Sequence, residues 1–258
     1  MNADTGTVSR VLRILSCFAE KDEWGLNELA RALGLPRASA HRLLNLCKPL
    51  DYVSQNERGH YVPGLELYRL AGKLSSVMPM HRLALPILQE VRDRTDETAL
   101  LALLVRRELR MFFSLSASPS HPLRYTVEHN RLEPLDWGAA ARVILAHLSE
   151  EEIATVVERA DPSPQDARPQ DKAELLQSLA GIRETGHAVT FAQRSPDSWG
   201  IAAPFFDAHD AVAGSINITV PSFRMEQHRR ADLVKLVMDA CARLTRQLGG
   251  TARGAAPA

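Results

Sequence analysis

The strongest constraint on the fold lies in residues 25–50, where a glycine and a proline separate two apolar helical patterns. The first pattern comprises Leu26, Leu29, Ala30 and Leu33, and the second comprises Ala40, Leu43, Leu44 and Cys47. Both follow the i, i+3, i+4, i+7 spacing of one buried helix face. Gly34 stands where helices end in a left-handed residue, and Pro36 stands in the first turn of the next helix. This punctuation predicts a helix-turn-helix arrangement.

The same apolar spacing occurs once before and once after this helix pair. The earlier stripe comprises Val8, Val11, Leu12 and Leu15, continued by Phe18, and the later one comprises Leu67, Leu70, Ala71 and Leu74. Between the pair and the later stripe, residues 52–54 and 60–62 predict two short strands joined by residues 56–59, where Gly59 can adopt a positive φ. The order predicts a winged helix-turn-helix domain over residues 1–62 and a linker helix over residues 63–78.

The outer face of the second helix of the pair fits the major groove of DNA. With its apolar stripe turned inward, Ala38, Arg42 and Asn45 point outward at about 100° per residue. Short side chains in the first turn permit close approach, and an arginine one turn later can pair with guanine or phosphate. The alternative is an ordinary solvated face of a small helical bundle. The candidate DNA-binding residues are Arg37, Ala38, Ser39, His41, Arg42, Asn45 and, at the tip of the wing, Arg58.

Charge, cysteine content and hydropathy narrow the partners of the chain. Its 31 basic and 31 acidic residues cancel, so a polyanion must bind a local patch. Residues 1–76 hold ten Lys or Arg against eight Asp or Glu, a slight basic bias. The longest apolar run, residues 99–105, is far shorter than the ~20 residues of a membrane span. Three distant cysteines without a CxxC pair fit a reducing cytoplasm. We therefore expect a cytoplasmic protein without a membrane partner.

The second half of the chain alternates strand and helix patterns. Prolines 79 and 86 bracket a short segment, after which a helix runs to about Asp93. The predicted strands are residues 98–105, 109–116, 123–127, 187–192, 200–206 and 212–220, and the predicted helices are residues 136–148, 149–160, 172–185 and 226–248. These elements predict one α/β domain over residues 79–248, followed by a disordered Gly/Ala-rich tail over residues 249–258. The whole chain is therefore expected to have an α+β fold.

Sequence motifs of catalysis are absent. No GxGxxG, phosphate loop, HExxH or GxSxG occurs, and the nine histidines are scattered. His121 and His129 have no third ligand at a suitable spacing. We expect no enzyme activity, no metal and no cofactor, although a triad assembled from distant residues is not excluded by one sequence. An enzyme with a helical N-terminal appendage and a winged-helix protein-interaction module are the alternatives.

Residues 26–37 (LNELARALGLPR) and 39–44 (SAHRLL) resemble the winged helix-turn-helix of the IclR family of bacterial transcriptional regulators. Residues 60–67 (HYVPGLEL) are similar to the wing and linker entry of that family, and Ala38 stands where it usually has Ser or Thr. The resemblance continues in family order through residues 120–124, 134–135, 138–148, 182–189 and 201–204. It implies a GAF-like C-terminal domain that binds a small effector, often a carboxylate, and a homodimer or dimer of dimers on a palindromic operator.

The effector pocket implied by this resemblance lies between the sheet and the helix that begins near Gly138. Unpaired N–H groups and small side chains at Gly138, Ala139 and Ala140 offer an anion site with room for a ligand. The alternative is a set of good helix formers packed tightly on the sheet. Asn217 and Thr219 alternate on one face of the last strand, where they can hydrogen-bond a ligand.

Departures from the family pattern suggest the effector type. Thr190 stands where the family often has an acid, and Gly200 stands where it often has Cys or Ser. Trp137 and Trp199 flank the same pocket, which favours a flat, aromatic acid that stacks on one of them. The alternative is that both rings fill the core. Asp136 either caps the helix or repels an anionic ligand.

The sequence therefore predicts a ligand-responsive DNA-binding regulator of a catabolic operon. Its effector is expected to be a small organic acid that changes how the linker helices hold the DNA-binding domains. The apolar linker stripe fits dimer packing and equally fits packing on its own domain. Repression and activation both remain open.

Overall fold

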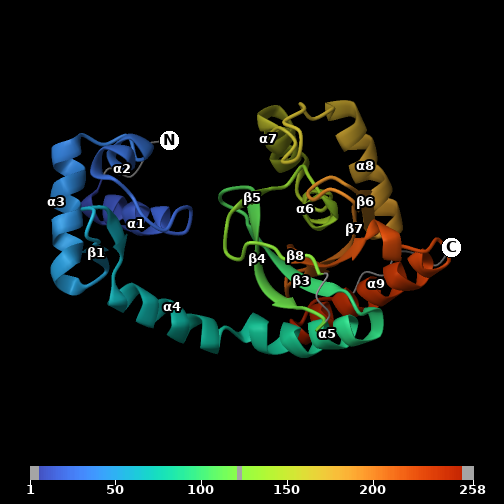
Figure 1. Ribbon diagram of the computed structural model, residues 1–258. Helices are drawn as coiled ribbons and strands as arrows, with labels where there is room; N and C mark the ends of the chain where they lie inside the picture. Colours follow the sequence, from blue (N-terminus) through green and yellow to red (C-terminus); the bar gives the residue numbers. More distant parts are fainter. Residues whose placement is uncertain (1–5, 121–123, 252–258) are drawn as a thin grey trace. The chain divides into compact units, whose positions relative to one another are not determined.

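The computed structural model describes residues 6–120 and 124–251, and the chain divides between Met78 and Pro79 into two compact units (Figure 1). The α+β fold class predicted from the sequence is confirmed. Leu123 of one predicted strand, His121 and residues 252–258 of the predicted tail lie outside the described residues.

The first unit has the predicted order of three helices, a hairpin and a fourth helix. Its elements are α1 (Thr7–Cys17), α2 (Leu26–Ala32), α3 (Arg37–Cys47), a 3₁₀ turn (Lys48–Leu50), β1 (Val53–Gln55), β2 (Tyr61–Pro63) and α4 (Leu65–Val77). Both strands begin one residue later than expected. Gly34 and Gly59 have φ values of 64° and 77°, so each glycine takes the left-handed conformation that its turn requires.

The predicted stripe of α3 is buried, and that of α2 is buried apart from the half-buried Leu26, but that of α1 is not. Ile14 is fully buried, whereas Val8 and Leu12 are 72% and 59% exposed. The packed stripe is Val11, Ile14, Leu15 and Phe18. It shares Val11 and Leu15 with the predicted stripe and has the same spacing. The choice between these two faces of α1 depends on its packing against α2 and α3. The apolar pattern of α1 alone does not contain that information.

The linker helix α4 enters through a tight backbone junction and is solvated along its length. Gly64 precedes it, and a side chain at this position would place Cβ 2.0 Å from the carbonyl oxygen of Asp51. The same Asp51 oxygen accepts the N–H of Glu66 at 3.1 Å. No described side chain of α4 is buried, and Leu74 is 57% exposed. The apolar stripe of α4 is therefore not packed into a core of its own domain.

The second unit is a six-stranded antiparallel sheet with helices on both faces (Figure 1). Its elements are α5 (Pro79–Thr95), β3 (Thr98–Val105), β4 (Arg110–Ala117), β5 (Glu133–Pro134), α6 (Ala139–Leu145), α7 (Glu150–Arg159), α8 (Lys172–Thr185), β6 (Ala188–Phe191), β7 (Ser198–Phe206), β8 (Val212–Pro221), a second 3₁₀ turn (Ser222–Arg224) and α9 (Arg229–Gln247). The strand order is β5-β4-β3-β8-β7-β6. One face packs against α5 and α9, and the other packs against α6.

Three elements of this unit differ from the sequence prediction. The helix α5 continues through Pro86, which has no N–H to donate to the carbonyl oxygen of Arg82. Both residues lie on the exposed side of the helix, so water can bond that carbonyl oxygen instead. Residues 124–127 form no strand; the edge of β4 is paired instead by β5 and by a bridge between Phe113 and His129. The helix α6 starts at Ala139 because Gly138, at φ 86°, has a non-helical backbone.

Two further features bear on function. No helix within residues 6–120 and 124–251 has the length and apolar content needed to cross a bilayer. In the same residues, no three His, Cys, Asp or Glu side chains gather into a group that could hold a metal ion.

Candidate functional site

The first candidate site is the outer face of α3. Ala40, Leu43, Leu44 and Cys47 are at most 4% exposed and hold this helix on the core of the unit. The opposite face carries the residues predicted from the sequence: Arg37, Ala38, His41, Arg42 and Asn45 are exposed, and Ser39 is half-buried. The structure therefore brings all six onto one solvated surface, which we call the α3 surface.

The arginines of the α3 surface and the wing form no ion pairs with the described residues, although Arg58 is attracted electrostatically by Glu23. Arg58 is exposed in the β1–β2 turn. Within the described part of the chain, no acidic side chain forms an ion pair with Arg37, Arg42 or Arg58. Among the described side chains of the α3 surface, the polar contact that forms joins His41 to Asn45 at 3.4 Å. The guanidinium groups are therefore available to phosphate or base edges.

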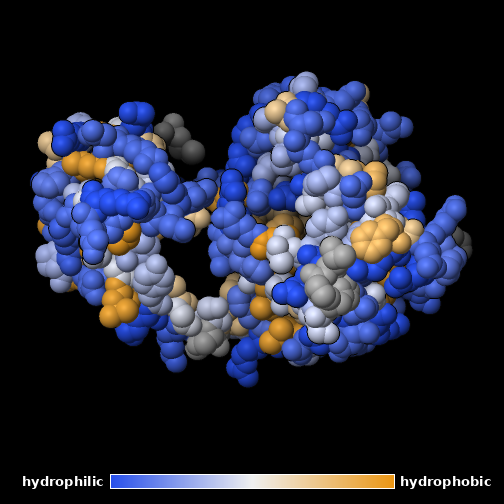
Figure 2. All heavy atoms as spheres, viewed as in Figure 1, coloured by the Kyte–Doolittle hydropathy of each residue, from blue (hydrophilic) through white to orange (hydrophobic). Residues whose placement is uncertain are grey.

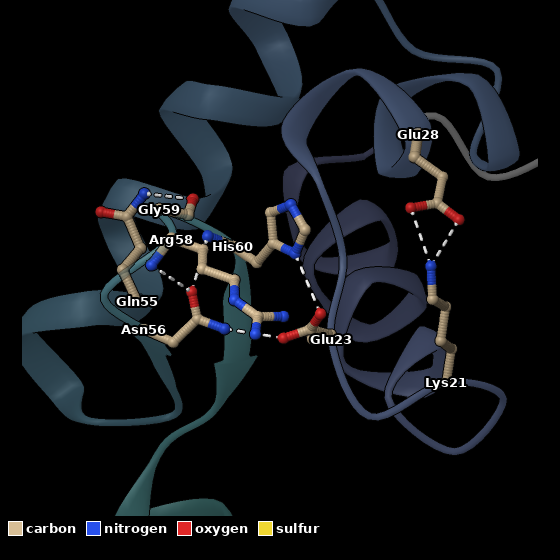
Figure 3. Close-up of polar contacts among 8 residues, drawn as sticks. All are labelled: Lys21, Glu23, Glu28, Gln55, Asn56, Arg58, Gly59 and His60. Atoms are coloured by element: carbon tan, nitrogen blue, oxygen red, sulfur yellow. Dashed lines mark hydrogen bonds and ion pairs between the residues drawn. The ribbon is translucent and has the colours of Figure 1, made fainter.

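A polar clasp fixes the wing against the loop between α1 and α2 (Figure 3). The side-chain oxygen of Asn56 accepts the N–H groups of Arg58 and His60 at 3.1 and 3.0 Å. Its amide nitrogen donates to Glu23 Oε2 at 2.7 Å, and Glu23 Oε1 lies 3.1 Å from His60 Nδ1. The bond from His60 lowers the pKa of Glu23 below its ordinary value.

Main-chain bonds support the same clasp. Trp24 and Tyr61 exchange N–H···O bonds of 2.9 and 2.8 Å, so a single antiparallel bridge ties the α1–α2 loop to β2. Glu23 was not predicted from the sequence, and Asn56 was predicted only as part of a turn. An asparagine at the start of a turn commonly bonds its own backbone two residues later, and this signal was available in the sequence.

The second candidate site is a small cavity, partly open to solvent, between α6 and the sheet of the second unit. Its lining residues are Leu100, Phe113, Tyr125, Thr126, Val127, Gly138, Ala139, Ala140, Thr190, Gln193, Arg194, Ser195, Ser198, Gly200, Asn217 and Thr219. Of the residues predicted to bind an effector, those that line it are Gly138, Ala139, Ala140, Thr190, Gly200, Asn217 and Thr219.

Two glycines keep this cavity open. The strand register aligns Thr190, Gly200 and Thr219 across β6, β7 and β8, so all three face α6. A Cβ on Gly200 would lie 3.2 Å from the hydroxyl oxygen of Thr190 and 3.3 Å from Cβ of Ala139. A Cβ on Gly138 would lie 2.5 Å from Cδ of Arg194. Larger side chains at either position would therefore intrude on their neighbours at the cavity wall.

The start of α6 is less open than the sequence suggested. The Gly138 N–H, predicted to be unpaired, donates to Gln193 Oε1 at 2.9 Å. Ala139 and Ala140 follow in the first turn, where N–H groups have no partner inside the helix. The anion site that we expected at three N–H groups is thus reduced by one.

Two loops close over the cavity and are tied to each other. The hydroxyl of Tyr125 donates to the carbonyl oxygens of Pro196 and Asp197 at 2.9 and 3.0 Å. The hydroxyl of Thr98 in turn donates to the carbonyl oxygen of Tyr125 at 3.1 Å. The segment of residues 124–127 and the β6–β7 loop therefore form one connected cover.

Comparison with known proteins places both units of the chain in one family. Residues 7–57 match the IclR helix-turn-helix domain, and residues 73–246 match the C-terminal domain of the bacterial transcriptional regulator IclR. The chain belongs to the IclR family. It is therefore a DNA-binding transcriptional regulator with an N-terminal helix-turn-helix and a C-terminal effector-binding domain, as the sequence predicted.

Relatives of this IclR-family regulator align over nearly its full length. The HTH-type regulator KipR of Bacillus subtilis is 26% identical over 95% of this chain and 98% of its own. The transcriptional repressor IclR of Escherichia coli is 25% identical, over 95% and 90%. Among solved structures, an IclR transcriptional regulator from Alicyclobacillus acidocaldarius is 22% identical, with a TM-score of 0.82 over 96% and 100% of the chains. An IclR homologue from Microbacterium hydrocarbonoxydans, solved in complex with 4-hydroxybenzoate, is 20% identical, with a TM-score of 0.75 over 94% and 99%.

The two tryptophans predicted to bind the effector of this regulator do not line the cavity beside α6. Trp137 is 2% exposed, and its indole N–H donates to the Asp161 carbonyl oxygen at 2.8 Å. Trp199 lies on β7 between two cavity residues, so strand alternation turns it to the opposite face. There its ring contacts Phe191 at 4.8 Å and Arg230 at 5.5 Å. Neither tryptophan is among the described residues that line this cavity, so the cavity does not support the prediction that an effector stacks on one of them.

Asp136 of the regulator neither caps α6 nor reaches the cavity. It is fully buried, and neither carboxylate oxygen has a well-formed hydrogen bond among the described residues. Burial raises the pKa of Asp136, although the nearby N–H groups of Asp136 and Asp161 favour the charged form. Arg142, which is 3% exposed, donates from Nε to the main-chain oxygen of Asp136 at 3.1 Å instead.

We predict that Asp136→Asn stabilises the second unit at neutral pH. A carboxyl whose pKa is raised on folding adds stability below its unfolded pKa and loses it as the pH rises through the folded value. As the pH rises from 4 to 7, the carboxyl therefore contributes less stability, and its replacement by an amide is expected to raise the free energy of unfolding at pH 7 by about 1–3 kcal/mol. Urea denaturation at pH 7 and pH 4 measures this, and the gain should shrink at pH 4.

The exposed Asp239 of α9 supplies the matched control. Asp239→Asn is expected to change stability by less than about 0.5 kcal/mol. If Asp136→Asn were instead destabilising at pH 7, the carboxylate would be held by the charge of Arg142, and our account of its burial would be wrong.

Proposed function

We propose that this protein regulates a catabolic operon in response to a small organic acid that binds in the cavity beside α6. The observation that carries the proposal is the pairing of two complementary sites in one chain. The α3 surface presents arginines without acidic partners among the described residues. The cavity in the other unit is lined by one charged residue, the cation Arg194, among the residues described. The first suits DNA and the second suits an anion.

An aromatic acid is supported by rings other than the tryptophans. Phe113 and the half-buried Tyr125 line the cavity, and the Arg194 guanidinium lies 5.7 Å from the Phe113 ring centre. A flat ligand can pack on these rings while its acid group meets the arginine. The homologue solved in complex with 4-hydroxybenzoate shows that an IclR relative accommodates such a molecule.

We further propose a homodimer, or a dimer of dimers, that acts in the cytoplasm on a palindromic operator. The exposed apolar side chains of α4 support this assembly, since Leu65, Tyr68 and Leu74 are 73%, 63% and 57% exposed. The face seen in Figure 2 is mainly hydrophilic and is interrupted by separate apolar patches. Effector binding would shift the population of dimers whose α4 helices hold the two α3 surfaces at the operator spacing.

The protein is proposed to act by binding alone. No His, Cys, Asp or Glu is among the described residues that line the cavity, so it offers no side chain suited to activate a nucleophile. Turnover of a metabolite independent of DNA would contradict this.

The test is operator binding measured by fluorescence anisotropy on fragments of the region upstream of the gene. We expect submicromolar binding to one fragment that weakens steeply with salt and changes when candidate acids are added. A thermal-shift screen of metabolites identifies those acids, because a true effector raises the melting temperature. Binding to no fragment, with or without these acids, would contradict the proposal.

A further inference from the structure

The β6–β7 loop delivers one cation to the cavity. Arg194 lies on this loop, with 23% of its side chain exposed. Its Nη2 pairs with Glu133 Oε2 at 3.0 Å, whereas its Nη1 is buried without a hydrogen-bond partner among the described residues. One edge of the guanidinium is therefore anchored, and the other donor group is left unsatisfied.

The backbone is shaped to admit this side chain. Gly138 combines a φ of 86° with a ψ of 157°, a region that residues with a Cβ rarely occupy. The aliphatic part of Arg194 occupies the space beside residue 138. A Cβ on Gly138 would lie 2.5 Å from Cδ and 2.8 Å from Cγ of Arg194. The neighbouring Gln193 is held by the Gly138 N–H at 2.9 Å. Arg194 is thus seated against the start of α6 and is not a loosely placed surface residue.

A second unsatisfied group lines the same cavity. Asn217 of β8 is 5% exposed, and its Oδ1 has no hydrogen-bond partner within the described residues. A buried polar atom without a partner is destabilising because it gives up its bonds to water. Such atoms in a native structure call for a ligand or water that completes them. A buried donor on Arg194 and a buried acceptor on Asn217 therefore define complementary requirements for one occupant.

We propose that Arg194 binds the carboxylate of the effector and that Asn217 Oδ1 accepts a hydrogen bond from a hydroxyl or amino group of the same molecule. The effector class is thus a hydroxy- or amino-substituted carboxylic acid. This inference rests on the proposed function of the cavity and narrows it. A carboxylate suits the guanidinium because charge-assisted bonds are about twice as strong as neutral ones.

The test uses the full-length protein and matched pairs of small molecules. The acids that carry a donor are 4-hydroxybenzoate, 4-aminobenzoate and lactate, and those without one are benzoate and propionate. An uncharged probe, 4-hydroxybenzyl alcohol, carries the donor without the acid. Titration calorimetry is expected to show binding of at least one donor-bearing acid. Loss of the donor or of the acid group should weaken that binding by about 10- to 100-fold.

Variants test which residue binds each group of the effector. Arg194→Gln should weaken binding of that acid about 10- to 100-fold, and Arg194→Lys, which keeps the charge but loses the planar fork, should weaken it less. Asn217→Leu should abolish the preference for a donor-bearing acid over its unsubstituted partner. Arg230→Gln removes a cation from the opposite face of the sheet and should change nothing. Melting of each variant without ligand reports whether it is folded.

The inference is overturned if none of the three donor-bearing acids binds, if Arg194→Gln binds like the parent, or if the donor preference survives in Asn217→Leu. Operator-binding assays separate this failure from failure of the proposed function. A molecule that lacks either group but still changes operator affinity would leave the regulatory function standing and refute the Arg194–Asn217 assignment. If no metabolite changed operator affinity, the proposed function itself would fail.

Discussion

A Gly64→Ala variant is expected to lose about 3 kcal/mol or more of the folding free energy of the first unit. The new Cβ would lie 2.0 Å from the carbonyl oxygen of Asp51 and 2.5 Å from its carbonyl carbon. Backbone atoms cannot rotate away as a flexible side chain can, so the junction between the wing and α4 must shift. Overpacking typically costs about 1–3 kcal/mol, and a clash with rigid backbone lies at or above that range. The hydrogen bonds from Gly64 and Glu66 to residues 52 and 51 would be strained with it.

Native-state hydrogen exchange of the full chain measures this effect. Amides of residues 7–63 should lose protection in Gly64→Ala, while amides of the sheet in the second unit should keep it. Gly72→Ala is the matched control, because it lies on the same helix with no atom within 4 Å of the new Cβ. That variant should gain about 0.5–1 kcal/mol from helix propensity. Equal behaviour of the two variants would show that the junction is more pliable than its geometry indicates.

The Arg37→Ala/Arg42→Ala double variant is expected to weaken operator binding by about 2–6 kcal/mol. Each arginine is exposed on the α3 surface without an acidic partner among the described residues, and removal of a base-reading or phosphate-binding arginine costs about 1–3 kcal/mol. The two losses should add, because the two side chains share no interaction in the described part of the chain. The slope of affinity against salt should also become shallower by about one for each phosphate group that is no longer bound.

Fluorescence anisotropy at several salt concentrations measures both quantities. Arg107→Ala is the control, since Arg107 is exposed in the β3–β4 turn of the other unit. It removes the same charge away from the α3 surface and should leave the affinity unchanged. Loss of affinity in the control, or none in the double variant, would place the DNA-binding surface elsewhere.

Residues that end and begin helices made the elements of the first unit predictable from its sequence. The face that each helix buries was harder to predict. Gly34 and Pro36 mark the helix boundaries through backbone preferences that act within one or two residues. In α1, two overlapping stripes share Val11 and Leu15, and only packing against α2 and α3 chooses the face that holds Ile14. Register along the chain was therefore predictable, but this rotation about the helix axis was not.

For the cavity, too, some features were predictable and others were not. The resemblance to the IclR family placed residues of α6, β6, β7 and β8 around one pocket, and most of the predicted residues line the cavity. Trp199 was misplaced because the strand was expected to start at Gly200, although β7 begins at Ser198. Adjacent strand residues face opposite ways, so Trp199 and Gly200 cannot share a cavity. Arg194 lies on a loop without periodicity and gave no local signal.

The clasp formed by Glu23, Asn56 and His60 has a consequence for how signals can reach DNA. Because it joins the wing to the loop before α2, the clasp fixes Arg58 relative to that loop within a single subunit. We therefore expect the spacing between the wing and the helix-turn-helix to be set when the domain folds, before any metabolite arrives. In the proposed dimer, an effector would then alter the separation between the half-sites that two subunits read. The base sequence that each subunit prefers would stay constant.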